Sequence, residues 1–321
     1  MTAPIMTGEW PEFMNKMVNE VIKVGLDELA ETADYKLFME DKGSASLVTE
    51  RVQSIEPMGL MGRWYENSDR PQVAIHPGYA HQITQREFGS EIRVTKKMEH
   101  FQQFDVVGEA SRQMKMQPDW TLNVLWHNYL AVGDVATASQ AVVNGIPIIQ
   151  SDCPDGNPYF DTAHTFRSGG ATYSNHTTGT TTPSEAALNT INVALRRWQN
   201  PRGLPLNAKI ESALVPPDLD MTFQHTLNSR LDPLTANNRV NIASSLVSGG
   251  HKVLPYLEST TEWFLKTNIT MNALPFYKWG WKPQVSQRGP ETDSASNRAI
   301  CLDMCVGDAA GLHGHGLYKV G

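Results

Sequence analysis

The sequence predicts an α+β fold, and three segments carry that prediction. Residues 98–132 repeat apolar side chains at helical spacing over a long stretch. Residues 44–95 hold two strand-like flanks around an interior rich in proline and glycine. Residues 182–230 are typical of a helix, a short strand and a second helix. Such a unit needs further sheet to pack against and on its own fits either an α/β or an α+β domain.

The composition is that of a folding chain with a mild acidic excess. Its 321 residues are 40% hydrophobic and 19% charged, and a chain of this length suits about two domains. Lys and Arg total 27 against 34 Asp and Glu, a formal net charge of −7. This balance argues against a dedicated nucleic-acid-binding protein with a basic face. It is compatible with a protein that encloses nucleic acid and binds its phosphates only weakly.

Secretion and membrane insertion are not indicated. Three cysteines, Cys153, Cys301 and Cys305, are too few and odd in number for a disulfide framework. Residues 1–10 lack the basic and apolar regions of a signal peptide. No apolar stretch approaches the roughly 18 residues that a membrane span needs. We therefore expect a soluble protein made in a reducing cytoplasm, with no membrane partner.

A helix and then a long hairpin are predicted for the first third of the chain. Residues 10–40 have helical spacing, but their apolar face is thin and needs a neighbouring element. Ala45–Ile55 is rich in β-branched residues, and residues 88–95 alternate apolar and polar side chains, so both predict strands. Between them, prolines and glycines in residues 57–82 predict a broad irregular tip.

This tip is the candidate functional surface. Apolar side chains in an irregular exposed loop form a patch, and such patches usually mark interaction sites. Aromatic residues and arginine are also the types enriched at interface anchors. We expect a subunit interface formed by Met58, Leu60, Met61, Arg63, Trp64, Tyr65, Arg70 and Tyr79.

Helices and strands alternate in the rest of the chain. The periodic segment 98–132 is interrupted at Pro118, so it is either one kinked helix or two helices in line. Residues 145–182 are loop-rich. Thr182-Pro183-Ser184-Glu185 resembles a capping box, with Thr182 as the N-cap and Pro183 at the first helical position. The segments that follow are a short strand at Ala208–Val215, a helix starting at Pro216, strand candidates at His251–Leu257, Trp263–Thr270 and Ala299–Val306, a polar turn at 286–297 and a glycine-rich end at Gly311–Gly321.

One group of acidic residues leaves an enzymatic alternative open. Asp152, Asp155, Asp161 and His164 could serve as metal ligands of a hydrolase. The run lacks the alternating acids and closing glutamate of an EF-hand loop. Turn-forming aspartates are the default interpretation of such a segment.

Two further patterns are weak. Cys301, Cys305, His313 and His315 could be imagined as zinc ligands, but their spacing matches no common pattern. On a strand the two thiols would lie roughly 13 Å apart, too far to share one metal. The glycines at 311–316 are not followed by a helix, as a phosphate-binding loop requires. We therefore expect no catalytic residue, no metal site and no cofactor.

The order of several short motifs resembles the Mu-like family of phage major head subunits. The first is Asp152-x-x-Asp155-Gly156-x-x-Tyr159-Phe160-Asp161-x-x-His164, followed by Tyr173-Ser174-Asn175. Then come Ser184-Glu185-Ala186-Ala187-Leu188, Pro201-Arg202-Gly203-x-Pro205-Leu206, Leu214-Val215-Pro216-Pro217-x-Leu219 and, at the end, Gly316-Leu317-Tyr318-x-x-Gly321. No single motif is specific, and the order is most similar over residues 83–230.

The resemblance implies the Hong Kong 97-type coat fold. On this chain it would give an N-terminal arm at 1–43, an extended hairpin (the E-loop) at 44–96 and a peripheral domain with a long spine helix at 97–182. An axial domain would follow at 183–298, and a final strand at 299–321 would return to the peripheral domain. A split of the spine helix at Pro118 would depart from the family, and no residue pair is assigned to a covalent cross-link.

By the same resemblance the chain would be a major capsid subunit of a tailed phage. It would assemble with itself as hexamers and pentamers into an icosahedral head, in the host bacterial cytoplasm, and enclose double-stranded DNA without sequence-specific binding. Scaffold, portal and cement proteins are the further partners that the family implies. The alternatives are the metal-dependent hydrolase and another virion component, such as a portal or tail protein.

Overall fold

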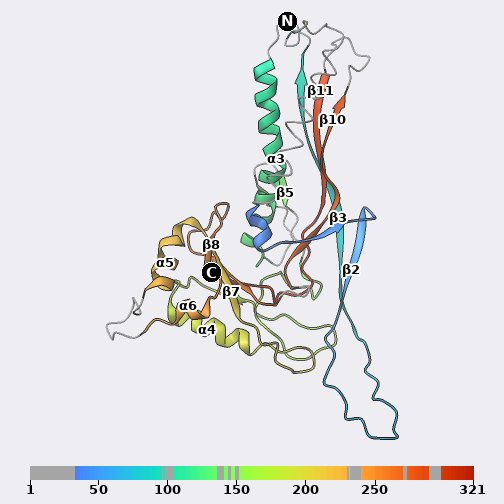
Figure 1. The fold of residues 1–321 in the computed structure, drawn as a ribbon, viewed down its shortest axis with the longest axis vertical. Coiled ribbons are helices and arrows are strands. Elements are labelled where there is room, and N and C mark those ends of the chain that lie inside the picture. Colours follow the sequence, from blue (N-terminus) through green and yellow to red (C-terminus); the bar gives the residue numbers. More distant parts are fainter. Residues whose placement is uncertain are drawn as a thin grey trace, which may run out of the picture.

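The computed structural model describes residues 33–95, 97, 104–135, 141–143, 146–148, 152–229, 231, 240–269, 273–288 and 298–321. Most of the helix expected at 10–40, and with it most of the expected N-terminal arm, lies outside the described residues. A long sheet runs beside helix α3, and a second sheet with shorter helices lies to one side of its lower end (Figure 1). This mixture of separate helices and sheets confirms the α+β class.

The long sheet has the strand order β1-β10-β11-β3-β2. β1 is parallel to β10, and the other neighbours are antiparallel. The bounds are β1 Glu40–Ser44, β2 Thr49–Ile55, β3 Pro77–Val94, β10 Phe276–Arg288 and β11 Arg298–Gly307.

The hairpin expected around an irregular tip is present. β2 and β3 pair from Thr49 opposite Thr84 to Ile55 opposite Pro77. Within β3, Glu91 and Arg93 are exposed while Val94 is buried, which confirms the strand with one wet face. The second strand begins at Pro77, earlier than expected, so the irregular part is residues 57–76.

Helix α3, Phe104–Ala131, is one helix with Pro118 inside it. Its first half packs Val107 and Met114 against strands β3 and β11. Its second half carries buried side chains into a larger core between the two sheets. Those side chains are Leu122, Leu125, Trp126, Tyr129 and Leu130, and they meet the short 3-10 helix η1, Asp34–Leu37, and its neighbour Phe38.

The second sheet has the order β6-β12-β9-β7-β8. Its strands are β6 His176–Thr177, β7 Ile210–Val215, β8 His251–Val253, β9 Trp263–Thr267 and β12 Leu317–Val320. Helices α4 Glu185–Arg196, α5 Asp220–Asn228 and α6 Ala243–Leu246 pack on it through a second core, and the 3-10 helix η2 Pro217–Leu219 precedes α5. A small pair, β4 Ala141–Val143 and β5 Ile146–Ile148, follows α3.

The expected cap of the first of these helices was placed two residues too early. Ser184 is the N-cap: its backbone is extended at φ −153° and ψ 161°, and its hydroxyl accepts the Ala187 N–H at 3.2 Å. Pro183 therefore precedes the cap and does not occupy the first helical turn. Thr182 has no capping role, because the helix begins only at Glu185.

The closing segment also differs from the expectation of one final strand at 299–321. β11 lies in the long sheet, whereas β12 lies in the second sheet between β6 and β9. β10, which the sequence did not predict, pairs with β11 from Trp279 to Arg288, so residues 286–288 of the expected polar turn are strand. The rest of that expected turn lies outside the described residues. The division of the chain into coat-fold parts stays a prediction. Within the described residues, no helix is long and apolar enough to cross a membrane.

Candidate functional site

The tip of the hairpin extends away from the rest of the molecule, as the long loop at the lower right of Figure 1 shows. Residues 57–76 form no helix and no strand, and their side chains are exposed. Met61 keeps 93% of its side-chain surface exposed and Leu60 keeps 78%. Seven of the eight candidate interface residues lie in this exposed stretch, from Met58 to Arg70. The structure thus brings them together on one projection.

The apex of the tip has an ordered local arrangement. The guanidinium of Arg63 lies over the ring of Tyr65 at 4.8 Å, and that of Arg70 lies over the ring of Trp64 at 5.6 Å. The Trp64 indole N–H donates to the Ser68 carbonyl at 2.7 Å. Contacts of a cation with an aromatic face contribute about 0.5–1 kcal/mol each when exposed. The apex therefore presents large aromatic surfaces that are already oriented.

Tyr79, the eighth candidate, lies elsewhere. It is half-buried in β3, at the base of the hairpin, and its hydroxyl lies 3.4 Å from the Thr165 hydroxyl of the same chain. Its assignment to the tip was wrong in position, because β3 starts at Pro77 and includes it. The sequence alone could not reveal this, since the glycine beside it resembles a loop residue.

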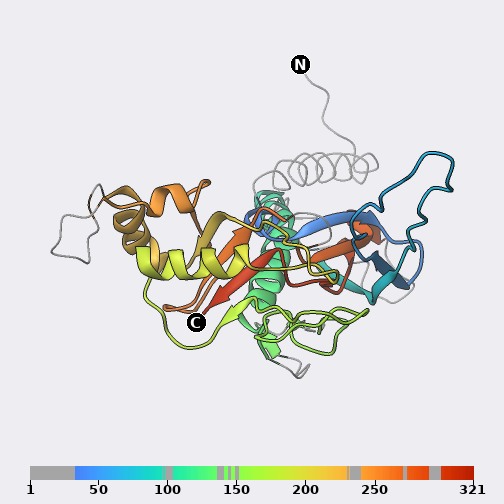
Figure 2. The same cartoon turned by 90° about the horizontal axis from the view of Figure 1, so that it is seen from below.

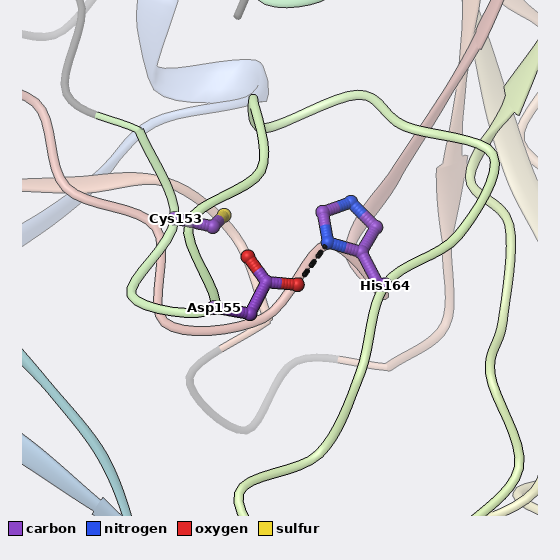
Figure 3. Close-up of side chains that lie close together, drawn as sticks. All are labelled: Cys153, Asp155 and His164. Atoms are coloured by element: carbon purple, nitrogen blue, oxygen red, sulfur yellow. Dashed lines mark hydrogen bonds and ion pairs between the residues drawn. The ribbon is translucent and has the colours of Figure 1, made fainter.

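The acidic residues that suggested a hydrolase are only partly brought together. Figure 3 shows His164 facing Asp155, with its Nδ1 2.8 Å from the Asp155 Oδ2 and both side chains almost fully buried. The Asp161 carboxylate instead accepts the N–H groups of Thr162 and Ala163, which is the turn-forming role. The pKa of the Asp152 carboxyl is raised by burial and by the charge of Asp155.

Cys153, Asp155 and His164 place their potential ligand atoms within 4.8 Å of one another. The contacts around them do not favour a metal. Asp155 also accepts the backbone N–H groups of Asn157 and Thr165. Burial alone would raise its pKa, but the hydrogen bond from His164, the charge of His164 and these backbone bonds together lower the pKa below its usual value.

The remaining contacts of the cluster support the same conclusion. The second nitrogen of His164 lies 3.1 Å from the Tyr159 carbonyl, which can only accept. Both ring nitrogens of His164 therefore already have partners within the protein. Burial raises the pKa of the Cys153 thiol well above its usual value, which disfavours the thiolate that a metal would need. The cluster is a buried hydrogen-bonded group with a structural role, and the hydrolase alternative has no support.

The four residues considered for zinc are also dispersed. Cys301 and Cys305 are on β11, where they pair with Glu91 and Glu87 of β3. His315 stacks on Tyr173 with ring centroids 3.7 Å apart. Among the described residues, the group that could hold a metal includes none of these four.

No family model and no curated protein matches the chain. Solved structures do match. A chain of the capsid of Ralstonia phage GP4 aligns with a TM-score of 0.51 and 12% identity, over 88% of this chain and 86% of that one. A chain of the capsid of an empty GTA particle aligns with a TM-score of 0.50 and 10% identity, over 90% of this chain and 89% of that one. The chain shares the fold of these capsid proteins. At such identities the likeness establishes the fold alone.

Proposed function

We propose that the chain is the major capsid subunit of a tailed phage, which assembles with itself into an icosahedral head around double-stranded DNA. One observation carries the proposal: almost the whole chain has the fold of capsid chains, including that of a Ralstonia phage. The exposed apolar tip agrees with it, because a subunit that stayed alone would leave these side chains in water.

The tip is the proposed contact between subunits. A hairpin that lies over the next subunit makes a head-to-tail contact, and such contacts form closed rings when the rotation closes. Rings of six and five copies are the hexamers and pentamers of an icosahedral shell. The exposed side chains Met58, Leu60, Met61, Trp64 and Tyr65 would be buried in that contact, with Arg63 and Arg70 at its rim.

The finer assignment follows the resemblance to Mu-like head subunits. In it, residues 1–43 are the arm, 44–96 the E-loop, 97–182 the peripheral domain, 183–298 the axial domain and 299–321 the return to the peripheral domain. We propose one change to these bounds: β10 pairs with β11, which pairs with β3, so β10 (276–288) fits the peripheral part better than the axial domain. Assembly in the host bacterial cytoplasm and contacts with scaffold, portal and cement proteins belong to the same proposal.

The net charge of −7 supports a shell that encloses DNA and binds it weakly. We expect free subunit to bind DNA feebly, with a strong dependence on salt and no preference for sequence. Tight, sequence-selective binding at physiological salt would contradict the proposal.

Expression of the full chain followed by sedimentation and negative-stain electron microscopy tests the proposal. Closed shells of uniform diameter are the expected result, with coexpressed scaffold protein if the chain alone remains as capsomers. Rings or tubes of fixed symmetry would instead indicate a portal or tail protein. A small oligomer with a stoichiometric metal and a chemical turnover would indicate an enzyme.

A further inference from the structure

The base of the hairpin, where it leaves the long sheet, is built differently from the tip. The Glu56 N–H donates to the His76 carbonyl at 3.1 Å, and the Ser54 hydroxyl donates to the Tyr79 carbonyl at 3.0 Å. A Cβ at Gly78 would lie 2.3 Å from the Ser54 hydroxyl oxygen, so the two strands approach very closely here. The hairpin thus enters its irregular part from a tightly fixed point.

A loop of the same subunit, residues 165–168, contacts both strands at this point. The Ser168 N–H donates to the Glu56 carboxylate at 3.0 Å, and the Arg167 guanidinium donates to the Gly78 carbonyl at 3.1 Å. The hydroxyls of Tyr79 and Thr165 lie 3.4 Å apart. Glu56 is only 5% exposed, and hydrogen bonds to a buried charged acceptor are stronger than neutral ones.

The loop is itself anchored in the body of the subunit. The buried ring of Phe166 lies in the second core, 5.4 Å from the Tyr173 ring and 5.7 Å from the His315 ring between centroids. The Thr165 N–H donates to Asp155, the carboxylate that also holds His164. The loop therefore connects the hairpin base to the second sheet through packed and hydrogen-bonded groups.

The direction of the hairpin depends strongly on this connection. Residues 57–76 form no ladder with any other described segment. Arms of about ten residues at about 3.3 Å each reach roughly 30 Å. A tilt of about 10° at the base would move the apex by about 5 Å, which is the spacing of neighbouring strands. Figure 2 shows the hairpin on the side of the molecule away from helices α4–α6. Beyond the base, the arm at Gly59 also passes close to Arg202.

We infer that residues 165–168 are an intrasubunit clamp that sets the direction of the hairpin, with Glu56 and Arg167 as its positioning residues. The inference deepens the proposed function, because the direction matters only if the tip must reach a second copy. The clamp itself exists in the isolated subunit and can be tested there.

The first test measures the direction of the hairpin in the free subunit. A Cβ at Gly59 would lie 3.8 Å from the Cγ of Arg202, so a Gly59→Cys, Arg202→Cys pair reports whether the arm keeps its place. Added Arg167→Met or Glu56→Ala should slow disulfide formation several-fold. Glu56→Gln keeps an acceptor for Ser168 and should restore most of the rate. Arg112→Met, which removes an exposed arginine of α3, is the matched control.

Amide hydrogen exchange is a second measurement, and it distinguishes local loosening at the hairpin base from a general loss of stability. In Arg167→Met, exchange at residues 54–56, 76–80 and 165–169 should rise about tenfold, while the β3–β11 ladder at 85–94 keeps its protection. Wild-type disulfide rates and wild-type exchange in both clamp variants would overturn the inference. If Glu56→Ala fails to fold, Arg167→Met and Tyr79→Phe still decide it.

Assembly separates the inference from the proposed function. If wild-type protein forms shells, the clamp variants should form irregular or partial particles, and uniform shells from them would contradict the inference. If wild-type protein forms no shells under any condition, the proposed function fails. The disulfide and exchange results then still decide whether the clamp exists.

Discussion

The hairpin tip and the closing segment of the chain differ in burial, and in each the burial is the opposite of what its composition suggests. The tip is rich in methionine, leucine and aromatic residues, yet Met61 is 93% exposed. The closing segment, Gly311–Gly321, is rich in glycine and histidine, yet nearly all of it is buried and Lys319 is 0% exposed. Composition therefore does not decide burial in this chain.

The difference follows from the partners that each backbone finds within its own subunit. β12 pairs with β9 on one side and β6 on the other. All three protons of the Lys319 ammonium can be accepted, by the Ala131 carbonyl at 2.9 Å, Asp134 at 3.0 Å and Glu262 at 3.2 Å. The tip has no ladder partner among the described residues, so its backbone polar groups remain in water and its apolar side chains remain exposed.

Loss of the Lys319 charge should have the largest effect on stability. Lys319→Met leaves two carboxylates and a helix-end carbonyl without their shared donor, and breaking a buried ion pair costs about 3 kcal/mol or more. We expect the free energy of unfolding in urea to fall by about that amount. Lys252→Met, on an exposed position of β8, is the control. A loss no larger than that of the control would mean that Lys319 does not hold the closing segment.

A pair of glycine substitutions compares the two regions directly. A Cβ at Gly316 would lie 2.5 Å from the Ala273 carbonyl oxygen and 2.7 Å from the Leu274 nitrogen, which are backbone atoms. Gly316→Ala should therefore destabilise by about 2–3 kcal/mol. Gly59→Ala meets only Arg202, at 3.8 Å, and should change the unfolding free energy by less than about 0.5 kcal/mol. If the two substitutions lowered the free energy of unfolding equally, in thermal or urea unfolding, the proposed difference between the closing segment and the tip would be wrong.

Acid should weaken the closing segment and leave the tip unaffected. Burial lowers the pKa of His315 well below its usual value, with a further contribution from the charges of His313 and His164. At mildly acidic pH, His315 binds a proton in the unfolded chain but not in the folded chain. The contribution of this group to the free energy of unfolding is therefore greatest above the unfolded pKa of about 6.5. Below it, stability falls by up to about 1.4 kcal/mol per pH unit for each such proton.

Urea unfolding between pH 7 and pH 5 measures this loss. His315→Phe keeps the stacking on Tyr173 and removes the proton, so its stability should depend less on pH. His76→Phe, which replaces an exposed histidine of the tip, is the control. Identical pH profiles for wild type and His315→Phe would show that this ring does not carry the acid sensitivity.

A smaller effect tests the corrected start of α4. Ser184→Ala removes the hydroxyl that accepts the Ala187 N–H and should cost about 1 kcal/mol. Thr182→Ala, at the position first expected to cap the helix, should leave stability unchanged. Hydrogen exchange at the first turn of α4 distinguishes the two variants. A larger effect at Thr182 would move the helix start back by two residues.

Sequence patterns predicted the elements whose signal is local. The prolines and glycines between two strand-like segments predicted the hairpin. The apolar spacing on both sides of Pro118 predicted the helical segment of α3, but it did not decide between one helix and two. The capping motif gave α4 with an error of two residues, because Thr182 and Ser184 are both good caps and only the backbone angle of Ser184 decides between them.

Pairings between distant segments could not be predicted. β10 mixes Trp279, Gly280, Trp281 and Pro283, and its identity as a strand depends on its partners β1 and β11, which are separate segments of the sequence. β12 resembles a glycine-rich tail until β9 is placed beside it. The Asp155–His164 contact and the contact of Glu56 with Ser168 likewise depend on how the fold brings their loops together. The sequence therefore predicted the exposed tip of the hairpin but not the contacts at its base.

The central claim is that the tip belongs to an interface between subunits and not to the core of its own subunit. Replacing residues 57–76 by a two-residue Asn-Gly turn between Glu56 and Pro77 tests it most directly, because β2 and β3 already meet there. The measurement is electron microscopy of the assembled product, with urea unfolding of the free subunit as its companion. We predict a folded subunit with wild-type stability that forms no shells. Normal shells from this variant, or a variant that cannot fold, would contradict the claim.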